Sequence, residues 1–159
     1  MNEITIRPAR AEDYPAVGLL LRQIAQQHAE LRPDVFHPAQ KYDKMQYATL
    51  LSDPDSPILV AEDGTGKILG YAMCQIKAWQ GHSVMRDRRW LYLDDLCVDE
   101  GCRGLGVGAQ LLQAVRELAR ARGLDRVELN VWECNEAALR FYERQGFITQ
   151  RRGLELFLD

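Results

Sequence analysis

The sequence lacks an apolar run of about 18 residues, the minimum for a membrane-spanning helix. Its first residues, Met-Asn-Glu-Ile-Thr-Ile, lack the basic and apolar regions of a secretory signal peptide. It also lacks an excess of positive charge, because 20 Lys and Arg residues stand against 23 Asp and Glu residues. These absences predict a cytoplasmic protein with no membrane or nucleic-acid partner, and they favour a cationic ligand.

Motifs for metal and nucleotide-triphosphate sites are also missing. The four cysteines and three histidines form neither C-x-x-C nor H-E-x-x-H, so we expect no metal site and reduced, mostly structural thiols. No Gly-Lys-Ser/Thr sequence is present, which excludes a Walker phosphate loop. Cys97 lies near the glycine-rich segment described below, but no histidine is close to it in sequence, and we favour a structural thiol over a nucleophile.

The 159 residues are 47% hydrophobic and 27% charged, as in an ordinary globular protein. No repeat, low-complexity tract or linker divides them, so we expect one domain over residues 1–159. Apolar periodicity and turn residues predict strands over 3–7, 58–62, 67–77, 90–98, 127–132 and 147–158, and helices over 11–29, 43–51, 109–122 and 135–145. This order predicts an α/β fold whose mixed sheet carries helices on both faces.

The segment Arg103-Gly-Leu-Gly-Val-Gly108 joins the strand predicted over 90–98 to the helix predicted over 109–122. Its glycines let the backbone approach a ligand closely and present successive N–H groups. The start of a helix adds unpaired N–H groups and a partial positive charge. The segment therefore favours a phosphate or pyrophosphate ligand.

Two carboxylates, Asp94 and Asp95, interrupt the apolar run of the same strand. Side chains alternate along a strand, so both can face one cleft only where a bulge redirects one of them. Their proximity to an anion site favours acid–base chemistry on a phosphate-bearing cofactor. Ion pairs with Arg88, Arg89 or Arg103 are the alternative, and the sequence leaves both interpretations open.

A dinucleotide-binding motif competes for the same glycines. Gly104-x-Gly106-x-x-Ala109 fits G-x-G-x-x-A, and Glu128 lies where an acid should meet a ribose. However, residues 99–103 separate the strand from the first glycine, and Glu128 falls early in its strand. We therefore disfavour this interpretation.

The segment Arg103–Gly108 resembles the acetyl-CoA signature of the GNAT superfamily of N-acetyltransferases, with Arg103, Gly106 and Gly108 at its defining positions. A second block follows in the family's order. Asn130–Asn135, Ala137–Tyr142 and Gln145–Phe147 are similar to the family's strand, its asparagine-led helix with a tyrosine, and its Gly-Phe ending. The resemblance covers nearly all of the chain.

The resemblance implies a largely antiparallel sheet in which the strands at about 90–98 and 126–132 splay apart, with the pantetheine arm of acetyl-CoA between them. Backbone groups of Leu96, Cys97 and Val98 would bind this arm. The implied contacts of the pyrophosphate are Arg103, Gly104, Leu105, Gly106, Val107 and Gly108, and those flanking the pantetheine are Asn135, Ala138, Phe141 and Tyr142.

The resemblance also implies direct attack of an acceptor amine on the thioester in a ternary complex. An aliphatic amine with a pKa near ~10 is protonated at neutral pH, so Asp94 or Asp95, the first being favoured, is expected to act as base or to bind the amine. Tyr142 matches the general acid for the departing thiolate, and a backbone N–H near Cys97 would polarise the carbonyl. The residues expected near the acceptor are Asp94, Asp95, Glu133, Phe36 and Tyr42.

Structural roles compete with several of these assignments. Asn135 is equally explained as a helix N-cap, and Tyr142 taken alone as a packing residue. Phe36, Tyr42 and Tyr47 either line a cleft or anchor their loop. His28 and His37 are expected at the surface rather than in catalysis.

We therefore predict an acetyl-CoA-dependent N-acetyltransferase. Its acceptor would be a small-molecule or protein amine, such as a polyamine, an amino sugar, a lysine or a protein N-terminus. The alternatives are a catalytically silent acyl-CoA-binding module and, less favoured, a dinucleotide-binding oxidoreductase. The last predicted strand offers an edge through which a homodimer could form.

Overall fold

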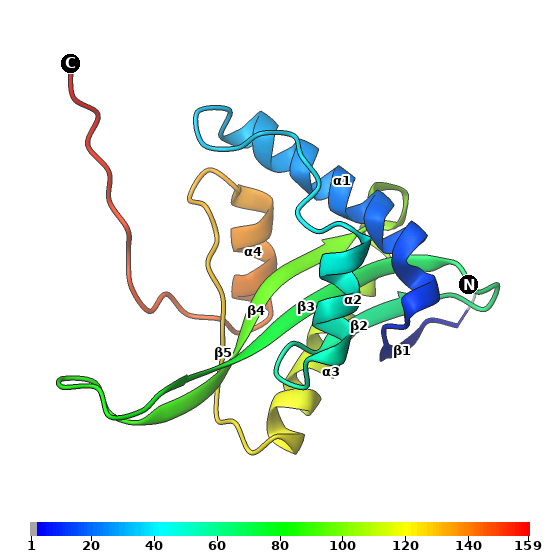
Figure 1. Ribbon diagram of the computed structural model, residues 1–159. Helices are drawn as coiled ribbons and strands as arrows, with labels where there is room; N and C mark the ends of the chain where they lie inside the picture. The colour runs from blue at the N-terminus through cyan, green and yellow to red at the C-terminus, as the bar shows by residue number, and fades with distance from the viewer. Residues whose placement is uncertain (1–2) are drawn as a thin grey trace.

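The computed structural model describes residues 3–159 of the chain. One sheet contains β1 (Thr5–Pro8), β2 (Ile58–Glu62), β3 (Ile68–Trp79), β4 (Arg88–Val98) and β5 (Val127–Glu128), in that order. The first four strands pair antiparallel, and β5 pairs parallel to β4. The predicted mixed, largely antiparallel sheet is confirmed (Figure 1).

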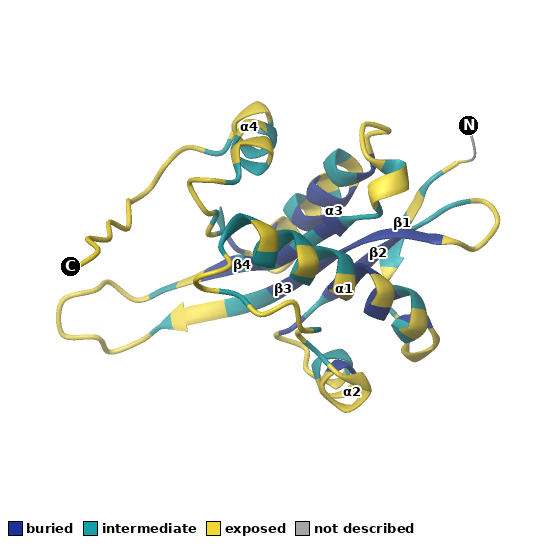
Figure 2. Ribbon diagram, turned by 90° about the horizontal axis from the view of Figure 1, so that it is seen from above, coloured by how far each residue is buried: buried dark blue, intermediate teal, exposed yellow. Residues whose placement is uncertain are grey.

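Helices cover both faces of this sheet, as predicted. The short 3-10 helix η1 (Ala11–Asp13) leads into α1 (Tyr14–Leu31), which packs with α2 (Lys44–Ser52) on one face. The helix α3 (Val107–Ala121) packs on the other, and α4 (Glu136–Arg144) adds Phe141 and Tyr142 to the same core. Figure 2 shows α1 and α3 on opposite sides of the buried strands.

The helix α3 anchors the glycine-rich segment to the sheet. Its apolar side chains recur at helical spacing, and Val107, Leu111, Leu112 and Val115 are buried. Burial of a side chain of this size contributes about 1.5–3 kcal/mol. The helix ends where Gly123 adopts a φ of 69°, a left-handed conformation that glycine tolerates. The start of α3 is thus held firmly beside the end of β4.

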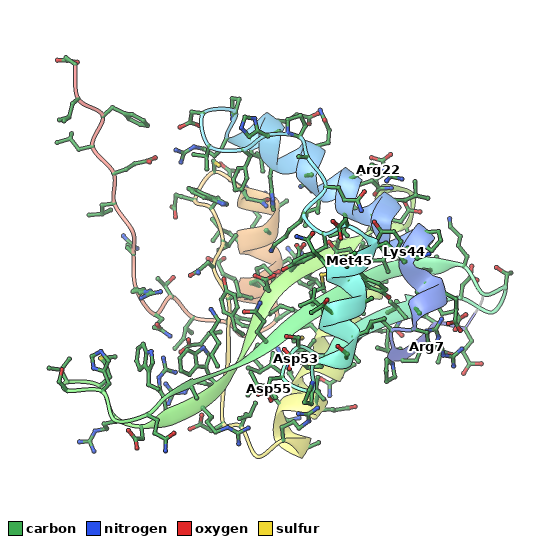
Figure 3. The ribbon with its side chains drawn as sticks, viewed as in Figure 1. Arg7, Arg22, Lys44, Met45, Asp53 and Asp55 are labelled. Carbon is green, nitrogen blue, oxygen red and sulfur yellow. The ribbon has the colours of Figure 1, made fainter. Side chains whose placement is uncertain are left out.

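Charged side chains fix the other end of the sheet. Arg7 on β1, labelled in Figure 3, donates to Asp13 at 2.8 Å and to Glu62 at 2.7 Å. These bonds join β1, β2 and the start of α1. The Tyr47 hydroxyl donates to the Arg10 carbonyl at 2.8 Å, and its ring is buried. Tyr47 therefore anchors α2 and does not line a cleft.

The C-terminal part of the sheet differs from the prediction. The strand predicted over 127–132 is limited to two residues, and the strands predicted over 147–158 are absent. Residues 148–159 instead form an extended segment without secondary structure (Figure 1). Gln150 donates to Glu128 of β5 at 2.8 Å, and Glu155 pairs with Arg32 at 2.9 Å. Ile148, Leu154 and Leu158 are 91%, 93% and 87% exposed. Their alternation suits a strand, but this segment forms no strand pairing with β5, the edge strand on that side of the sheet.

The hairpin between β3 and β4 is longer than predicted. The expected loop over 79–89 is shortened because β3 reaches Trp79 and β4 begins at Arg88. The Arg88 guanidinium lies 4.7 Å from the Trp79 ring centre and 4.0 Å from that of Trp90, and it donates to Glu128 at 2.7 Å.

Within residues 3–159, no helix is both long enough and apolar enough to span a membrane.

Candidate active site

A cleft of about 710 Å³ opens where β4 and β5 separate. The two strands pair only at Leu91 with Val127 and at Tyr92 with Glu128, so the splay predicted between them is present. The cleft is lined by the end of β4, the glycine-rich segment, residues 129–132 and α4. Lys41 and His28, from the region around α1, close one side of it.

The glycine-rich segment lies at one end of this cleft. Gly104 and Gly106 have φ values of 80° and 81°, and a Cβ atom built on either would meet no other atom within 4 Å. Gly106 is the N-cap of α3 and offers no side chain to cap its first turn. The first N–H groups of α3 therefore remain free for an anion, as a pyrophosphate site requires.

The first turn of α4 lies across the cleft from this segment. A Cβ atom at Gly108 would approach the Phe141 ring to 3.3 Å, so a side chain there would crowd α4. Asn135 Oδ1 accepts from the Ala138 N–H at 3.3 Å, which confirms its role as an N-cap. Asn135, Ala138 and Phe141 all line the cleft. The Asn135 amide nitrogen has no hydrogen bond among residues 3–159, so a ligand can use it.

Tyr142 also lines the cleft. Its ring packs edge-on against those of Phe141 and Phe147, with ring centres 5.1 and 5.5 Å away. Burial raises the pKa of its hydroxyl, with a smaller effect from the Asp95 charge, so the group keeps its proton at neutral pH. Within the described part of the chain, no group hydrogen-bonds this hydroxyl. Tyr142 thus combines the expected packing role with an available proton.

Asp94 and Asp95 lie at a bulge in β4. Residue Met73 pairs with Asp95 and Cys74 with Leu93, which leaves Asp94 as the extra residue. Both acids line the cleft, and both bond to residues on the α1–α2 side of the sheet. The bulge that this arrangement requires is therefore present.

Asp94 occupies the more open position of the two. Its Oδ2 atom accepts from Lys41 Nζ at 2.8 Å and from the Tyr42 hydroxyl at 3.1 Å. Its Oδ1 atom accepts no hydrogen bond among the described residues. Because no buried side-chain oxygen in that part of the chain lacks a partner, Oδ1 is open to solvent. Asp94 can therefore receive a further donor.

Asp95 lies behind Asp94 and is 9% exposed. The buried Tyr71 hydroxyl donates to its Oδ2 atom at 2.9 Å. Burial raises the pKa of the Asp95 carboxyl to about 6, although the Lys41 charge and the Tyr71 hydrogen bond oppose this effect. The alternative ion pairs with arginine are absent from the described contacts of both acids. Arg88 pairs with Glu128 instead, and Arg103 lies 3.5 Å from Gln27.

The remaining predicted residues are distributed more widely. Leu96, Cys97, Val98, Arg103 and Val107 line the cleft. Leu105 and Glu133 are exposed. Phe36 packs between His28 and Trp132, with ring centres at 5.1 and 5.6 Å, and anchors its loop. The Cys97 thiol is buried 3.5 Å from the Leu20 carbonyl, and burial raises its pKa to about 12, which disfavours a nucleophile.

Three residues of the site were missed by the sequence analysis. Lys41 and Tyr71 contact the two acids from 53 and 24 residues away in the sequence. His28 lines the cleft, where burial and the Lys41 charge lower its pKa. Each lies in an otherwise ordinary loop, strand or helix, so no motif in the sequence marks it.

The dinucleotide interpretation does not fit this geometry. A Rossmann-type fold carries a parallel sheet, whereas four of these strands pair antiparallel. The Glu128 carboxylate, which would bind the ribose, accepts instead from Arg88 and from Gln150 at 2.8 Å. Among residues 3–159, no three His, Cys, Asp or Glu side chains gather as a metal site.

Comparison with known proteins agrees with this arrangement. The Acetyltransferase (GNAT) family matches residues 21–147. Streptothricin acetyltransferase of Streptomyces lavendulae is 33% identical over 95 residues, which are 60% of this chain and 46% of that protein. The chain thus spans about half the length of this relative.

Two further relatives match nearly the whole chain. Thialysine N-epsilon-acetyltransferase of Bos taurus is 26% identical over 99% of this chain and 92% of its own. The crystal structure of a tetramutant of BH1408 from Bacillus halodurans has a TM-score of 0.92 and 32% identity, over 97% of this chain and 99% of that one. From the match to most of its length, this chain belongs to the GNAT family of acetyltransferases.

Proposed function

We propose that the protein is an acetyl-CoA-dependent N-acetyltransferase. One observation carries this proposal: the phosphate-binding start of α3, the Tyr142 hydroxyl and the two acids of β4 line a single cleft. Two of the relatives named above are acetyltransferases, and one of them is an N-epsilon-acetyltransferase, which supports the same reaction.

Acetyl-CoA would bind with its pyrophosphate on the N–H groups at the start of α3 and its pantetheine arm between β4 and residues 129–132. The open space at Gly104 and Gly106 fits this position. Backbone groups of Leu96, Cys97 and Val98 lie along one wall, and Asn135, Ala138 and Phe141 lie along the other. The arm would replace the hydrogen bonds that β4 loses where β5 ends.

The acceptor ammonium would bind Asp94, whose Oδ1 atom is open to solvent. Asp94 accepts the ammonium proton, directly or through water, and Asp95 adds negative charge behind it. The amine nitrogen then forms a bond to the acetyl carbonyl carbon, the carbon–sulfur bond breaks, and the nitrogen gives up its second proton to water as the amide forms. The Tyr142 hydroxyl donates its proton to the departing thiolate and regains a proton from water.

The acids favour an acceptor that carries positive charge. The relatives' names include streptothricin and thialysine as acceptors, which supports a small-molecule amine. For the present chain we therefore propose that the acceptor is an aliphatic amine that is protonated at neutral pH.

The test is thiol release from acetyl-CoA with a panel of polyamines, amino sugars, amino acids and short peptides. A preferred acceptor would support the proposal. Binding of acetyl-CoA by calorimetry without acetylation of any acceptor would instead indicate a silent acyl-CoA-binding module. Failure to bind acetyl-CoA would contradict the proposed function.

The exposed segment over 148–159 supports a homodimer. Its apolar side chains are exposed, and β5, which continues into residues 129–132, has no strand on its outer side within residues 3–159. We propose that this segment of one copy pairs with that edge of a second copy. Light scattering should then show a dimer that Leu154→Lys with Leu156→Lys converts to a monomer, whereas Val84→Lys, at an 81% exposed site on the β3–β4 hairpin, does not. A monomeric wild type would contradict it.

A further inference from the structure

Lys41 and Asp94 place opposite charges side by side at the acceptor end of the cleft. Lys41 Nζ lies 2.8 Å from Asp94 Oδ2, and both residues line the cleft. The Lys41 side chain is 44% exposed and that of Asp94 is 18% exposed. The pair is thus accessible to a ligand, and it displays both a cation and an anion.

The loop before α2 holds Lys41 in this position. The Gln40 amide donates to the Tyr14 hydroxyl at 2.9 Å and to the Tyr42 carbonyl at 2.7 Å. Arg22 donates to the Gln40 oxygen at 2.9 Å, so every polar group of that amide fastens the loop to α1 or to itself. The Tyr42 hydroxyl adds a bond from the residue after Lys41 to Asp94. These bonds hold the backbone on both sides of Lys41 beside the cleft.

Each member of the pair has unused hydrogen-bonding capacity. Both donors to Asp94 bond to Oδ2, which leaves Oδ1 for an incoming ammonium. Lys41 has three N–H donors, and Asp94 is its one hydrogen-bond partner within residues 3–159. Its remaining donors suit an anion. Burial lowers the Lys41 pKa, but the hydrogen bond and charge of Asp94, together with the charges of Asp95 and Tyr42, raise it overall, so the lysine stays cationic.

We propose that Lys41 and Asp94 together select an acceptor that carries a carboxylate as well as its amine, as a free amino acid does. Asp94 Oδ1 would bind the ammonium and Lys41 the carboxylate. With a zwitterion bound, the ion pair between Lys41 and Asp94 is joined by two more, Asp94 with the ligand ammonium and Lys41 with the ligand carboxylate. The site gains no net charge. A polyamine would bring a second cation against Lys41, which is unfavourable. This inference rests on the proposed function and narrows its acceptor class.

Matched substrate pairs test the inference. We would compare kcat/KM for lysine against cadaverine, ornithine against putrescine, arginine against agmatine, and methionine against 3-(methylthio)propylamine. Each pair differs only in the carboxylate. The wild type should prefer the amino acid of a pair by about tenfold, as for a charge-assisted hydrogen bond. Lys41→Met should abolish that preference, and Lys41→Arg should keep most of it.

The control is Lys44→Met, the same substitution in the first turn of α2, where the side chain is exposed (Figure 3). It should leave the preference unchanged. A wild-type preference for the decarboxylated amines would overturn the inference. So would a Lys41→Met variant in which the ratio of kcat/KM between amino acid and amine is unchanged. If kcat/KM rises equally for both substrates of a pair, Lys41 only competes with the acceptor for Asp94, and the inference is overturned as well. Acetylation of amino sugars or peptides without any amino acid would overturn it and leave the proposed function standing. No acetyl-CoA binding would remove both.

Discussion

The two ends of the cleft are built in different ways. At the end where we propose that the cofactor binds, one continuous segment, 103–108, presents main-chain N–H groups at the start of a helix. At the end proposed for the acceptor, side chains from three distant segments meet, with Lys41, Tyr71 and Asp94 as examples. The cofactor end therefore depends on backbone conformation. The acceptor end depends on a few side chains that can change without disturbing the sheet, which suits a family whose named acceptors differ.

The largest effect is expected from Gly106→Asp, which alters the main-chain conformation at the start of α3. Gly106 has a φ of 81° at the N-cap of α3, so an aspartate is strained there and brings negative charge to the proposed phosphate site. We expect acetyl-CoA affinity to fall by about a hundredfold or more in calorimetry.

Gly123→Asp is the matched control, since Gly123 has a φ of 69° and lies beyond the other end of the same helix. It should lower the melting temperature through similar strain but leave acetyl-CoA affinity intact. Equal losses of affinity in the two variants would show that α3 stability, and not a phosphate site, was measured.

The acceptor end should respond to Asp94→Asn. The variant keeps the shape of the side chain but removes the charge that we propose binds the ammonium and accepts its proton. We expect kcat/KM for a cationic amine to fall by about a hundredfold. The affinity for acetyl-CoA, measured separately, should change by less than about twofold. A comparable loss in both quantities would contradict the separation of the two ends.

Tyr142 lies where the two ends meet, and Tyr142→Phe should have a smaller effect. A thiol with a pKa near ~8.5 leaves without much assistance, so we expect kcat to fall by about tenfold. Acetyl-CoA affinity should be retained, because the ring still packs against Phe141 and Phe147. Steady-state kinetics with a saturating acceptor would measure this effect. An unchanged kcat would remove Tyr142 from the mechanism.

Asp95 offers the smallest and most specific test, on stability. Burial raises its folded-state pKa to about 6, so the folded chain binds this proton more tightly than the unfolded chain does. The resulting stabilisation is fully present below about pH 4 and is lost as the pH rises through about 6.

Between pH 5 and pH 8, this loss should lower the free energy of unfolding of the wild type by about 1 kcal/mol relative to Asp95→Asn, which has no proton to lose. The asparagine oxygen can still accept from Tyr71. Denaturant titrations at both pH values would measure the difference. Parallel pH dependences in the two proteins would show that Asp95 titrates normally.

Most of the fold could be predicted from local patterns. The spacing of Leu111, Leu112 and Val115 and the turn residues around β2 and β3 reflect packing and chain geometry within single elements. The failure lies at 147–158, where the alternation of Leu154, Leu156 and Leu158 is typical of a strand. A strand also needs a partner strand, and alternation alone does not show whether the segment pairs with an edge of its own sheet.

The residues of the candidate site also fall into two groups, those that local sequence patterns mark and those that only the folded structure brings together. Gly104, Gly106 and Asn135 are marked by sequence because their role depends on backbone conformation and helix starts. Lys41 and Tyr71 are not marked, because their role arises only when the α1–α2 loop and β3 fold against β4. The bulge at Asp94 was foreseen only as a requirement, since its position depends on the register with β3.

A crystal structure of the protein with coenzyme A tests the central claim most directly. We predict that the pyrophosphate oxygens lie within hydrogen-bond distance of the N–H groups of residues 104–108. The pantetheine should lie between β4 and residues 129–132, and the sulfur should face the Tyr142 hydroxyl, with Asp94 on the open side. Coenzyme A bound outside the β4–β5 cleft, or with its phosphates away from the start of α3, would contradict the account.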